Sequence, residues 1–154
     1  MKRATLATLA GLFMLSCGSE DAETPVACFG DREAYLTALE DAPGEVRLDG
    51  TTPITACIVD GQSGGELGQV GEALVASATE LNRRAQGDPA GAATVQLGYL
   101  VGAVQEAASA TGGIHEDLVL RLDAAARLTG GSEPFPAEFE RAFGQGYAAG
   151  QASG

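Results

Sequence analysis

The stretch DPAGAATVQLGYLVGAVQEAASA, residues 88–110, decides the fold class of this 154-residue chain. Asp88 and Pro89 supply an N-cap and a proline for the first helical position, so we expect a helix from here to about Ala110. One face carries apolar residues at helical spacing: Leu97, Leu100, Val101, Val104 and Ala108. The remaining surface is nearly apolar too, through Val95, Gly98, Tyr99 and Gly102. Such a helix is buried, so the pattern predicts a core helix surrounded by others.

The spacing of Gly98 and Gly102 resembles the small-residue seam of membrane helix dimers. The apolar run around them is only about 15 residues long and has polar flanks, which is too short to span a bilayer. We therefore expect two soluble helices to pack closely where these side chains are absent.

Two further helices are predicted before the core helix. Residues 31–42 begin with Asp31 as N-cap and end at Pro43-Gly44. Residues 66–87 have a clear period of 3.6, with one apolar stripe formed by Leu67, Val70, Leu74, Ala78, Leu81 and Ala85. Residues 45–59, between these helices, are the one stretch with strand character and are expected to form a short hairpin or an extended segment.

Two more helices are predicted after the core helix. One starts after Gly112-Gly113 and ends at Gly130-Gly131, with an apolar stripe of Ile114, Leu118, Leu122, Ala125 and Leu128. The last, PFPAEFERAFGQGYAAGQ (residues 134–151), carries an aromatic residue at every fourth position: Phe135, Phe139, Phe143 and Tyr147. Core packing explains this aromatic stripe most simply, and a groove for an apolar ligand is the alternative.

The chain opens MKRATLATLAGLFMLSCG, residues 1–18. Lys2 and Arg3 precede an apolar run that is too short to cross a bilayer, which is typical of an export signal. The sequence Met14-Leu15-Ser16-Cys17 resembles the lipobox of bacterial lipoproteins, although the consensus has Leu where Met14 stands. The resemblance implies cleavage before Cys17 and acylation of Cys17, by palmitate or a similar chain. It covers these 18 residues only, and Gly18 is not the aspartate of an inner-membrane retention signal.

This resemblance divides the chain into a signal peptide (1–16), a lipidated flexible tether (17–27) and a single domain (28–154). It implies a location outside the cytoplasm, anchored in a cell membrane or outer membrane. In that oxidising setting the two remaining cysteines, Cys28 and Cys57, are expected to form a disulfide. The alternative, a reactive or metal-binding pair, lacks neighbouring histidines. The predicted fold is therefore all-α: a compact bundle of four to five helices whose short N-terminal extended or hairpin segment is stapled by one disulfide.

The formal net charge is −12, and it becomes −14 once Lys2 and Arg3 are removed with the signal. A polyanionic partner would be repelled, and the largest basic cluster is the pair Arg83-Arg84. We therefore expect no nucleic-acid partner. The acidity itself is typical of a soluble surface.

The sequence Gly61-Gln62-Ser63-Gly64-Gly65 matches the G-x-S-x-G elbow around a catalytic serine. The order Ser63, Asp88, His115 is also that of an α/β-hydrolase triad. That fold, however, needs parallel strands after the serine, where this chain has helical patterns. Ser63 and Glu66 instead fit a capping box at the start of a helix. His115 is the only histidine, so a two-histidine metal site is excluded, and we expect it at a solvated helix start.

The function favoured by these observations is a membrane-anchored, extracytoplasmic lipoprotein that works as a non-enzymatic interaction or structural module of the cell envelope. An envelope protein is a candidate partner, and neither a cofactor nor a metal is expected. A first alternative is a lipoprotein that binds small apolar ligands in a cavity lined by Phe139, Phe143 and Tyr147 together with the Gly98 and Gly102 side of the core helix. A second alternative is a serine hydrolase acting through Ser63.

Overall fold

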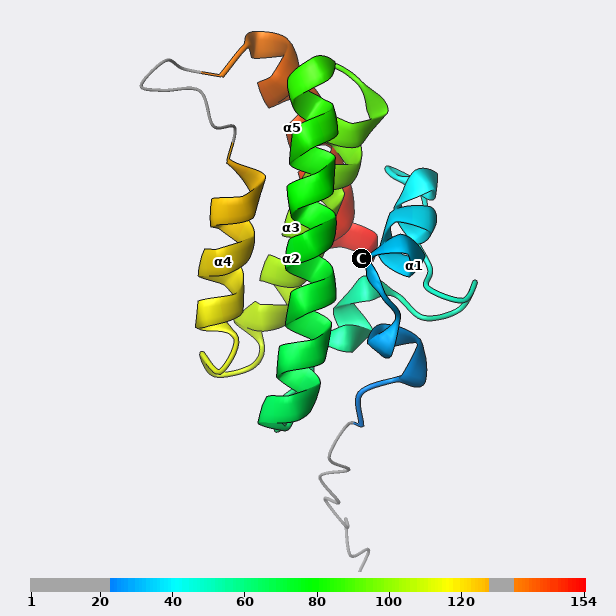
Figure 1. Ribbon diagram of the computed structural model, residues 1–154, viewed down its shortest axis with the longest axis vertical. Coiled ribbons are helices and arrows are strands. Elements are labelled where there is room, and N and C mark those ends of the chain that lie inside the picture. Colours follow the sequence, from blue (N-terminus) through cyan, green and yellow to red (C-terminus); the bar gives the residue numbers. More distant parts are fainter. Residues whose placement is uncertain (1–22, 128–134) are drawn as a thin grey trace, which may run out of the picture.

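The computed structural model describes residues 23–127 and 135–154, and this part of the chain is all-α, as predicted (Figure 1). It contains five α-helices: α1 (Arg32–Ala38), α2 (Gly64–Gly87), α3 (Ala92–Ser109), α4 (Glu116–Ala126) and α5 (Ala137–Ser153). Three short 3₁₀ helices join them: η1 (Val26–Phe29), η2 (Leu39–Asp41) and η3 (Ile54–Cys57). No helix in the described ranges is long and apolar enough to cross a membrane.

Helix α3 lies at the centre of the bundle, as its sequence predicted. Helices α2 and α4 pack on one side of it, while α5 packs against another side and makes its main contacts with α3 alone (Figure 1). The helix begins later than predicted, at Ala92. Asp88 is not its N-cap but the C-cap of α2, where its carbonyl oxygen accepts a hydrogen bond from the amide of Gly91 at 3.0 Å.

Helices α3 and α5 run parallel and touch through their backbones. A Cβ added to Gly98 or Gly102 would collide with the backbone of Phe143 or Tyr147. From the other side, a Cβ on Gly146 would collide with the carbonyl oxygen of Val95. The predicted close packing at the glycine pair is therefore confirmed. The expectation that Gly98 and Gly102 line a ligand cavity is wrong, because the backbone of α5 fills that space.

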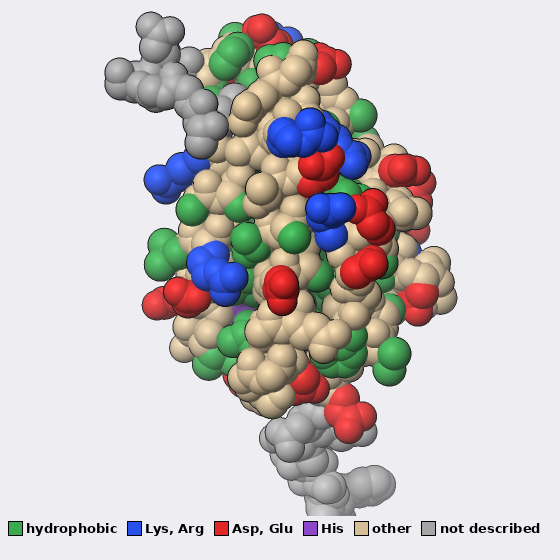
Figure 2. Space-filling view, in the orientation of Figure 1, with side chains coloured by type: hydrophobic (Ala, Val, Ile, Leu, Met, Phe, Trp, Pro, Cys, Tyr) green, Lys and Arg blue, Asp and Glu red, His purple; other side chains and the backbone are tan. Residues whose placement is uncertain are grey.

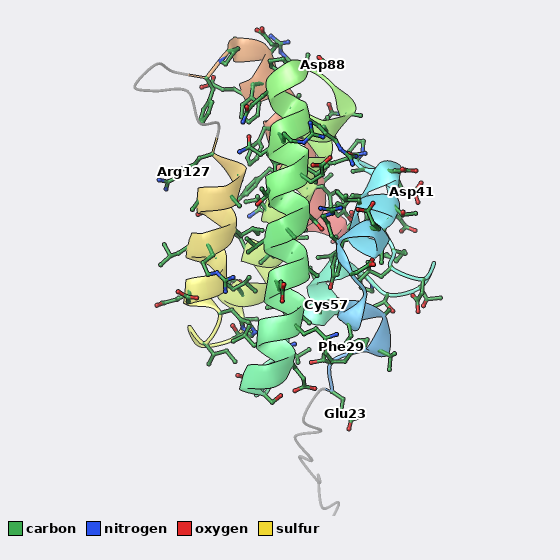
Figure 3. The ribbon with its side chains drawn as sticks, viewed as in Figure 1. Glu23, Phe29, Asp41, Cys57, Asp88 and Arg127 are labelled. Atoms are coloured by element: carbon green, nitrogen blue, oxygen red, sulfur yellow. A yellow bond between two sulfur atoms is a disulfide. The ribbon has the colours of Figure 1, made fainter. Side chains whose placement is uncertain are left out.

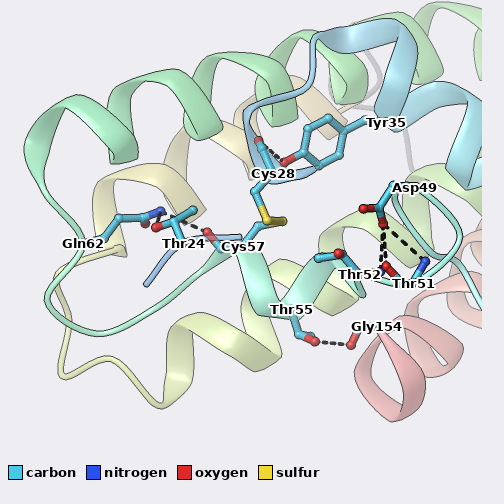
Figure 4. Close-up of a disulfide and its surroundings, with 10 residues drawn as sticks. All are labelled: Thr24, Cys28, Tyr35, Asp49, Thr51, Thr52, Thr55, Cys57, Gln62 and Gly154. Atoms are coloured by element: carbon cyan, nitrogen blue, oxygen red, sulfur yellow. Dashed lines mark hydrogen bonds between the residues drawn. A yellow bond between two sulfur atoms is a disulfide. The ribbon is translucent and has the colours of Figure 1, made fainter. Parts of the chain in front are cut away.

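The N-terminal part of the domain is fastened by the disulfide between Cys28 and Cys57, whose Cα atoms lie 5.3 Å apart (Figure 4). The hydroxyl of buried Tyr35 donates to the Cys28 carbonyl at 2.8 Å, and burial raises the pKa of this hydroxyl. The segment predicted as hairpin or extended contains one isolated bridge, between Leu48 and Thr52. Thr24, near the start of the described residues, is buried.

Helix α4 is held at both ends. Gly112 and Gly113 form the turn before it with φ angles of 61° and 94°, which side-chain-bearing residues rarely adopt. At the other end, the side-chain nitrogen of buried Asn82 in α2 donates to the carbonyls of Ala125 and Arg127 at 2.9 and 2.6 Å. The predicted terminal glycines of this helix, residues 130–131, lie outside the described residues, as do Leu128 and all of residues 1–22.

Candidate functional site

Ser63 is the N-cap of α2. Its hydroxyl oxygen accepts from the amide of Glu66 at 3.3 Å, and the Glu66 carboxylate accepts from the amide of Ser63 at 2.9 Å. These reciprocal bonds form the predicted capping box and lower the pKa of Glu66 through its hydrogen bonds with Ser63. The hydroxyl thus accepts a hydrogen bond from the backbone, and no base donates to or accepts from it in the described part of the chain.

The three residues of the hydrolase alternative do not meet. Ser63 and Asp88 cap opposite ends of the 24-residue helix α2, a separation of about 36 Å at 1.5 Å per residue. Figure 3 shows Asp88 at one end of the molecule and Cys57, six residues before Ser63, well away from it. Both ring nitrogens of His115 are bonded to residues other than Ser63. The geometry needed for a serine, histidine and aspartate to relay a proton is therefore absent.

His115 is fully buried, so the expectation of a solvated histidine is wrong. Its Nε2 atom lies 3.0 Å from Oε1 of Gln62, and its Nδ1 atom lies 2.9 Å from the hydroxyl of Thr111. The side-chain nitrogen of Gln62 donates to the Cys57 carbonyl and to Thr24 at 3.2 and 2.9 Å (Figure 4). Oε1 of Gln62 therefore faces the ring of His115. With Oε1 of Gln62 facing the ring, Nε2 of His115 carries a proton and donates to it, while the Thr111 hydroxyl, which donates its own proton to the Ala108 carbonyl at 2.8 Å, lies beside Nδ1.

Burial lowers the pKa of His115, since the charged ring loses its hydration, while the nearby Asp60 carboxylate partly opposes this shift. The network joins Thr24 and Gln62 to the turn between α3 and α4. His115 is thus a buried structural histidine that fixes three segments to one another. The flanking residues Glu116 and Asp117 do lie in the first turn of α4, as predicted.

Two open pockets, each lined by residues of α3 and α4, follow one another along α4 and are together called the α4 groove. Its first part has a volume of about 450 Å³ and lies between the ends of α3 and α4 that meet at the turn. It is lined by Gln105, Ala108, Ser109, Gly113, Glu116, Val119 and Leu120. Most of this lining is apolar, and the one charged residue in it is a carboxylate.

The second part of the groove has a volume of about 320 Å³ and lies between α4 and α5. Val101 of α3 forms its floor, and Phe135, Phe139 and Phe143 form one wall. These rings continue in register to Tyr147, with successive centroids 5.0, 5.7 and 6.2 Å apart. Of the three predicted ligand-binding residues, Phe139 and Phe143 therefore line a groove, whereas Tyr147 lies beyond it.

A chain of hydrogen bonds separates the two parts. The hydroxyl of Tyr147 donates to Oε1 of Gln105 at 2.6 Å, and Nε2 of Gln105 donates to Asp123 at 2.9 Å. These bonds join α5, α3 and α4. Gln105 lines the first part and Asp123 lines the second, so these bonds lie between the two parts and satisfy the polar groups there.

Exposed apolar side chains gather beside this groove. In residues 23–127 and 135–154 four large hydrophobic residues are exposed, and three of them, Ile114, Leu120 and Phe135, lie in or next to its lining. Leu120 is the most exposed of these three, with 68% of its surface accessible. By contrast, the face crossed by α2 carries scattered charged side chains, among them Glu80 with its partners Arg83 and Arg84 (Figure 2).

Sequence reasoning found the aromatic wall but missed the α4 wall. The signal was Leu120, which falls off the apolar stripe of its own helix and so could have been identified as a surface residue. No group of His, Cys, Asp or Glu side chains suited to a metal ion occurs within the described ranges. Comparison with known proteins found no similarity: no family model matches the chain, and neither a curated protein nor a solved structure resembles it significantly.

Proposed function

We propose that this chain is a lipid-anchored protein outside the cytoplasm, and that it works as a non-enzymatic interaction module of the cell envelope. The apolar groove along α4, with Leu120 exposed at its rim, is the observation that carries the interaction role. Apolar residues exposed side by side on a soluble domain mark surfaces that bind other molecules. Acylation of Cys17 would hold this groove near a membrane surface.

The disulfide supports the proposed location. Cys28 and Cys57 are bonded, and structural disulfides persist mainly in oxidising compartments. Buried Thr24 is seven residues after Cys17, so a connection between the two residues spans at most about 25 Å. An anchored domain would thus stay within a few nanometres of the bilayer.

Metabolic labelling with an alkyne analogue of palmitate tests the anchor. The native host should incorporate the label into the wild-type chain and not into Cys17→Ser. Intact mass should also show that residues 1–16 have been removed from the wild type. An unlabelled chain that keeps its first 16 residues would refute the anchor and leave the groove to be tested separately.

The apolar-ligand alternative keeps one supporting observation, since Phe139 and Phe143 line a groove of about 320 Å³. Small-molecule sites usually enclose most of the ligand surface, whereas this groove is open. Native mass spectrometry of the chain purified without detergent distinguishes the two roles. A stoichiometric apolar molecule lost in Phe143→Ala would favour the carrier, and its absence would favour the interaction module.

A further inference from the structure

Resting on the proposed interaction role, we infer that the groove along α4 receives an amphipathic helix of a partner protein, with an apolar face and basic flanks. The walls are two rows of side chains at helical spacing. On α4 the row is formed by Glu116, Leu120, Asp123 and Arg127. Opposite α4, a second row formed by Phe135, Phe139 and Phe143 lines the second part of the groove, while residues of α3 line the first part.

Rows with this spacing suit a helix better than other peptide forms, because ridges of one helix fit the grooves between rows of another. The α4 wall from Glu116 to Arg127 covers 12 residues, or about 18 Å at 1.5 Å per residue. A partner helix of about three turns therefore matches its length. An added β-strand has no sheet edge to join, since the described residues contain only one isolated bridge.

The charge of the lining selects a basic partner. Three carboxylates, those of Glu116, Asp123 and Glu140, line the groove, against the single guanidinium of Arg127. The whole chain is acidic as well, with a net charge of −12. Lysine or arginine residues beside the apolar face of the partner would meet these carboxylates, and long-range attraction would speed their encounter. A second copy of this chain would instead bring like charge into contact.

The probe is a fluorescent 14-residue helical peptide with leucines on one face and lysines on both flanks. A second peptide carries glutamate in place of every lysine. Fluorescence anisotropy is measured against the full chain purified from its host, in phosphatidylcholine nanodiscs if it carries lipid and in buffer if it does not. Empty nanodiscs correct for binding of the peptide to lipid.

The lysine peptide should bind saturably, and Leu120→Asp should weaken that binding at least tenfold. Leu120 is largely exposed, so this change leaves the fold intact, which circular dichroism verifies. Val26→Asp is the matched control, because Val26 is 85% exposed and is not part of the groove lining; its affinity should equal that of the wild type. Glu116→Lys should weaken the lysine peptide and strengthen the glutamate peptide.

Three results would overturn the inference: no saturable binding, equal affinity of both peptides for the wild type, or unchanged affinity in Leu120→Asp. Self-association that Leu120→Asp abolishes, measured by ultracentrifugation, would replace the partner helix with a second copy. The anchor is read independently at Cys17. If the chain is lipidated but does not bind the peptides, only the proposed helical partner is refuted. If the chain binds the peptides but is not lipidated, only the proposed lipid anchor is refuted.

Discussion

Nε2 of His115 lies 3.0 Å from Oε1 of Gln62, which precedes it by 53 residues, and the histidine ring is fully buried. The two side chains join the turn before α4 to the loop before α2. Through Gln62 the same network reaches the hydroxyl of buried Thr24, 2.9 Å from the Gln62 side-chain nitrogen. His115, the only histidine of the chain, thus helps to hold the segment around Thr24 against the helical bundle.

Stability should fall as the pH drops from about 7.5 to 5.5. The folded-state pKa of His115 is lowered from its ordinary 6.5 by burial, so the unfolded chain binds a proton first as the pH decreases. The free energy of unfolding should therefore decrease with a slope of at most about 1.4 kcal/mol per pH unit, the limit for one proton. Urea unfolding at several pH values measures this slope.

The matched control is His115→Gln, which cannot titrate but keeps a side chain able to donate to Gln62. Its stability should be flat over the same interval. Carboxylate groups ordinarily titrate at a lower pH than this interval. Hydrogen bonds from Arg83 and Arg84, for example, lower the pKa of Glu80 to about 2. Equal slopes in both proteins would show that another group causes the pH dependence.

Ser63→Ala should destabilise the protein by about 1 kcal/mol, because it removes the acceptor for the Glu66 amide at the first turn of α2. Ser63→Thr keeps a hydroxyl and should retain most of that stability. Thermal or urea unfolding measures both. Fluorophosphonate probes should leave the wild type unlabelled. If they label it, and Ser63→Ala abolishes the labelling, the serine-hydrolase hypothesis would be supported instead.

The double variant Cys28→Ser/Cys57→Ser should be less stable than the oxidised protein by about 3 to 4 kcal/mol. The bond spans a sequence separation of 29 residues, and without it the unfolded chain regains the entropy of that loop. Reductant added to the wild type should lower the urea midpoint to a similar value, and it should not affect the variant. A midpoint unchanged by reductant would mean that the bond contributes little.

The helical pattern predicted most of the fold because each helix has an apolar face with its own period. The capping box at Ser63 was also predictable, since both partners lie within four residues. The burial of His115 was not, because its partner Gln62 is distant in sequence and a helix start with two acidic residues indicates solvent. Similarly, the sequence pattern of α2 does not indicate that Asn82 binds the end of α4, whose carbonyls belong to residues more than 40 positions away.

The groove could not be predicted, because it depends on how α5 packs relative to α3 and α4, and the sequence pattern of each helix does not give that arrangement. Helix α5 packs mainly on α3 and leaves a gap beside α4, which Phe139 and Phe143 then line. The spacing of the aromatic residues predicted that they share one face of α5, but it did not predict which helix or groove that face would contact. Which face meets which neighbour is decided by backbone contact at Gly98 and Gly146, where side chains are missing.

That contact leads to the sharpest stability prediction. Gly146→Ala should destabilise the protein by about 1 to 3 kcal/mol or more, because the new methyl group collides with the Val95 carbonyl oxygen and would also lie 2.9 Å from the amide nitrogen of Tyr99. Neither neighbour is a flexible side chain, so the two helices must move apart. Their close packing along Gly150 and Gly102 would be lost as well.

Gly144→Ala, two residues earlier in the same helix, should change the free energy of unfolding in the opposite direction. Gly144 is exposed, and a Cβ there would meet no atom within 4 Å. Alanine has the higher helix propensity, so this variant should gain up to about 1 kcal/mol. Urea unfolding of both variants beside the wild type checks the pair. If both changes raise stability, helix propensity and not backbone contact governs α5, and the packing of α5 on α3 is looser than described.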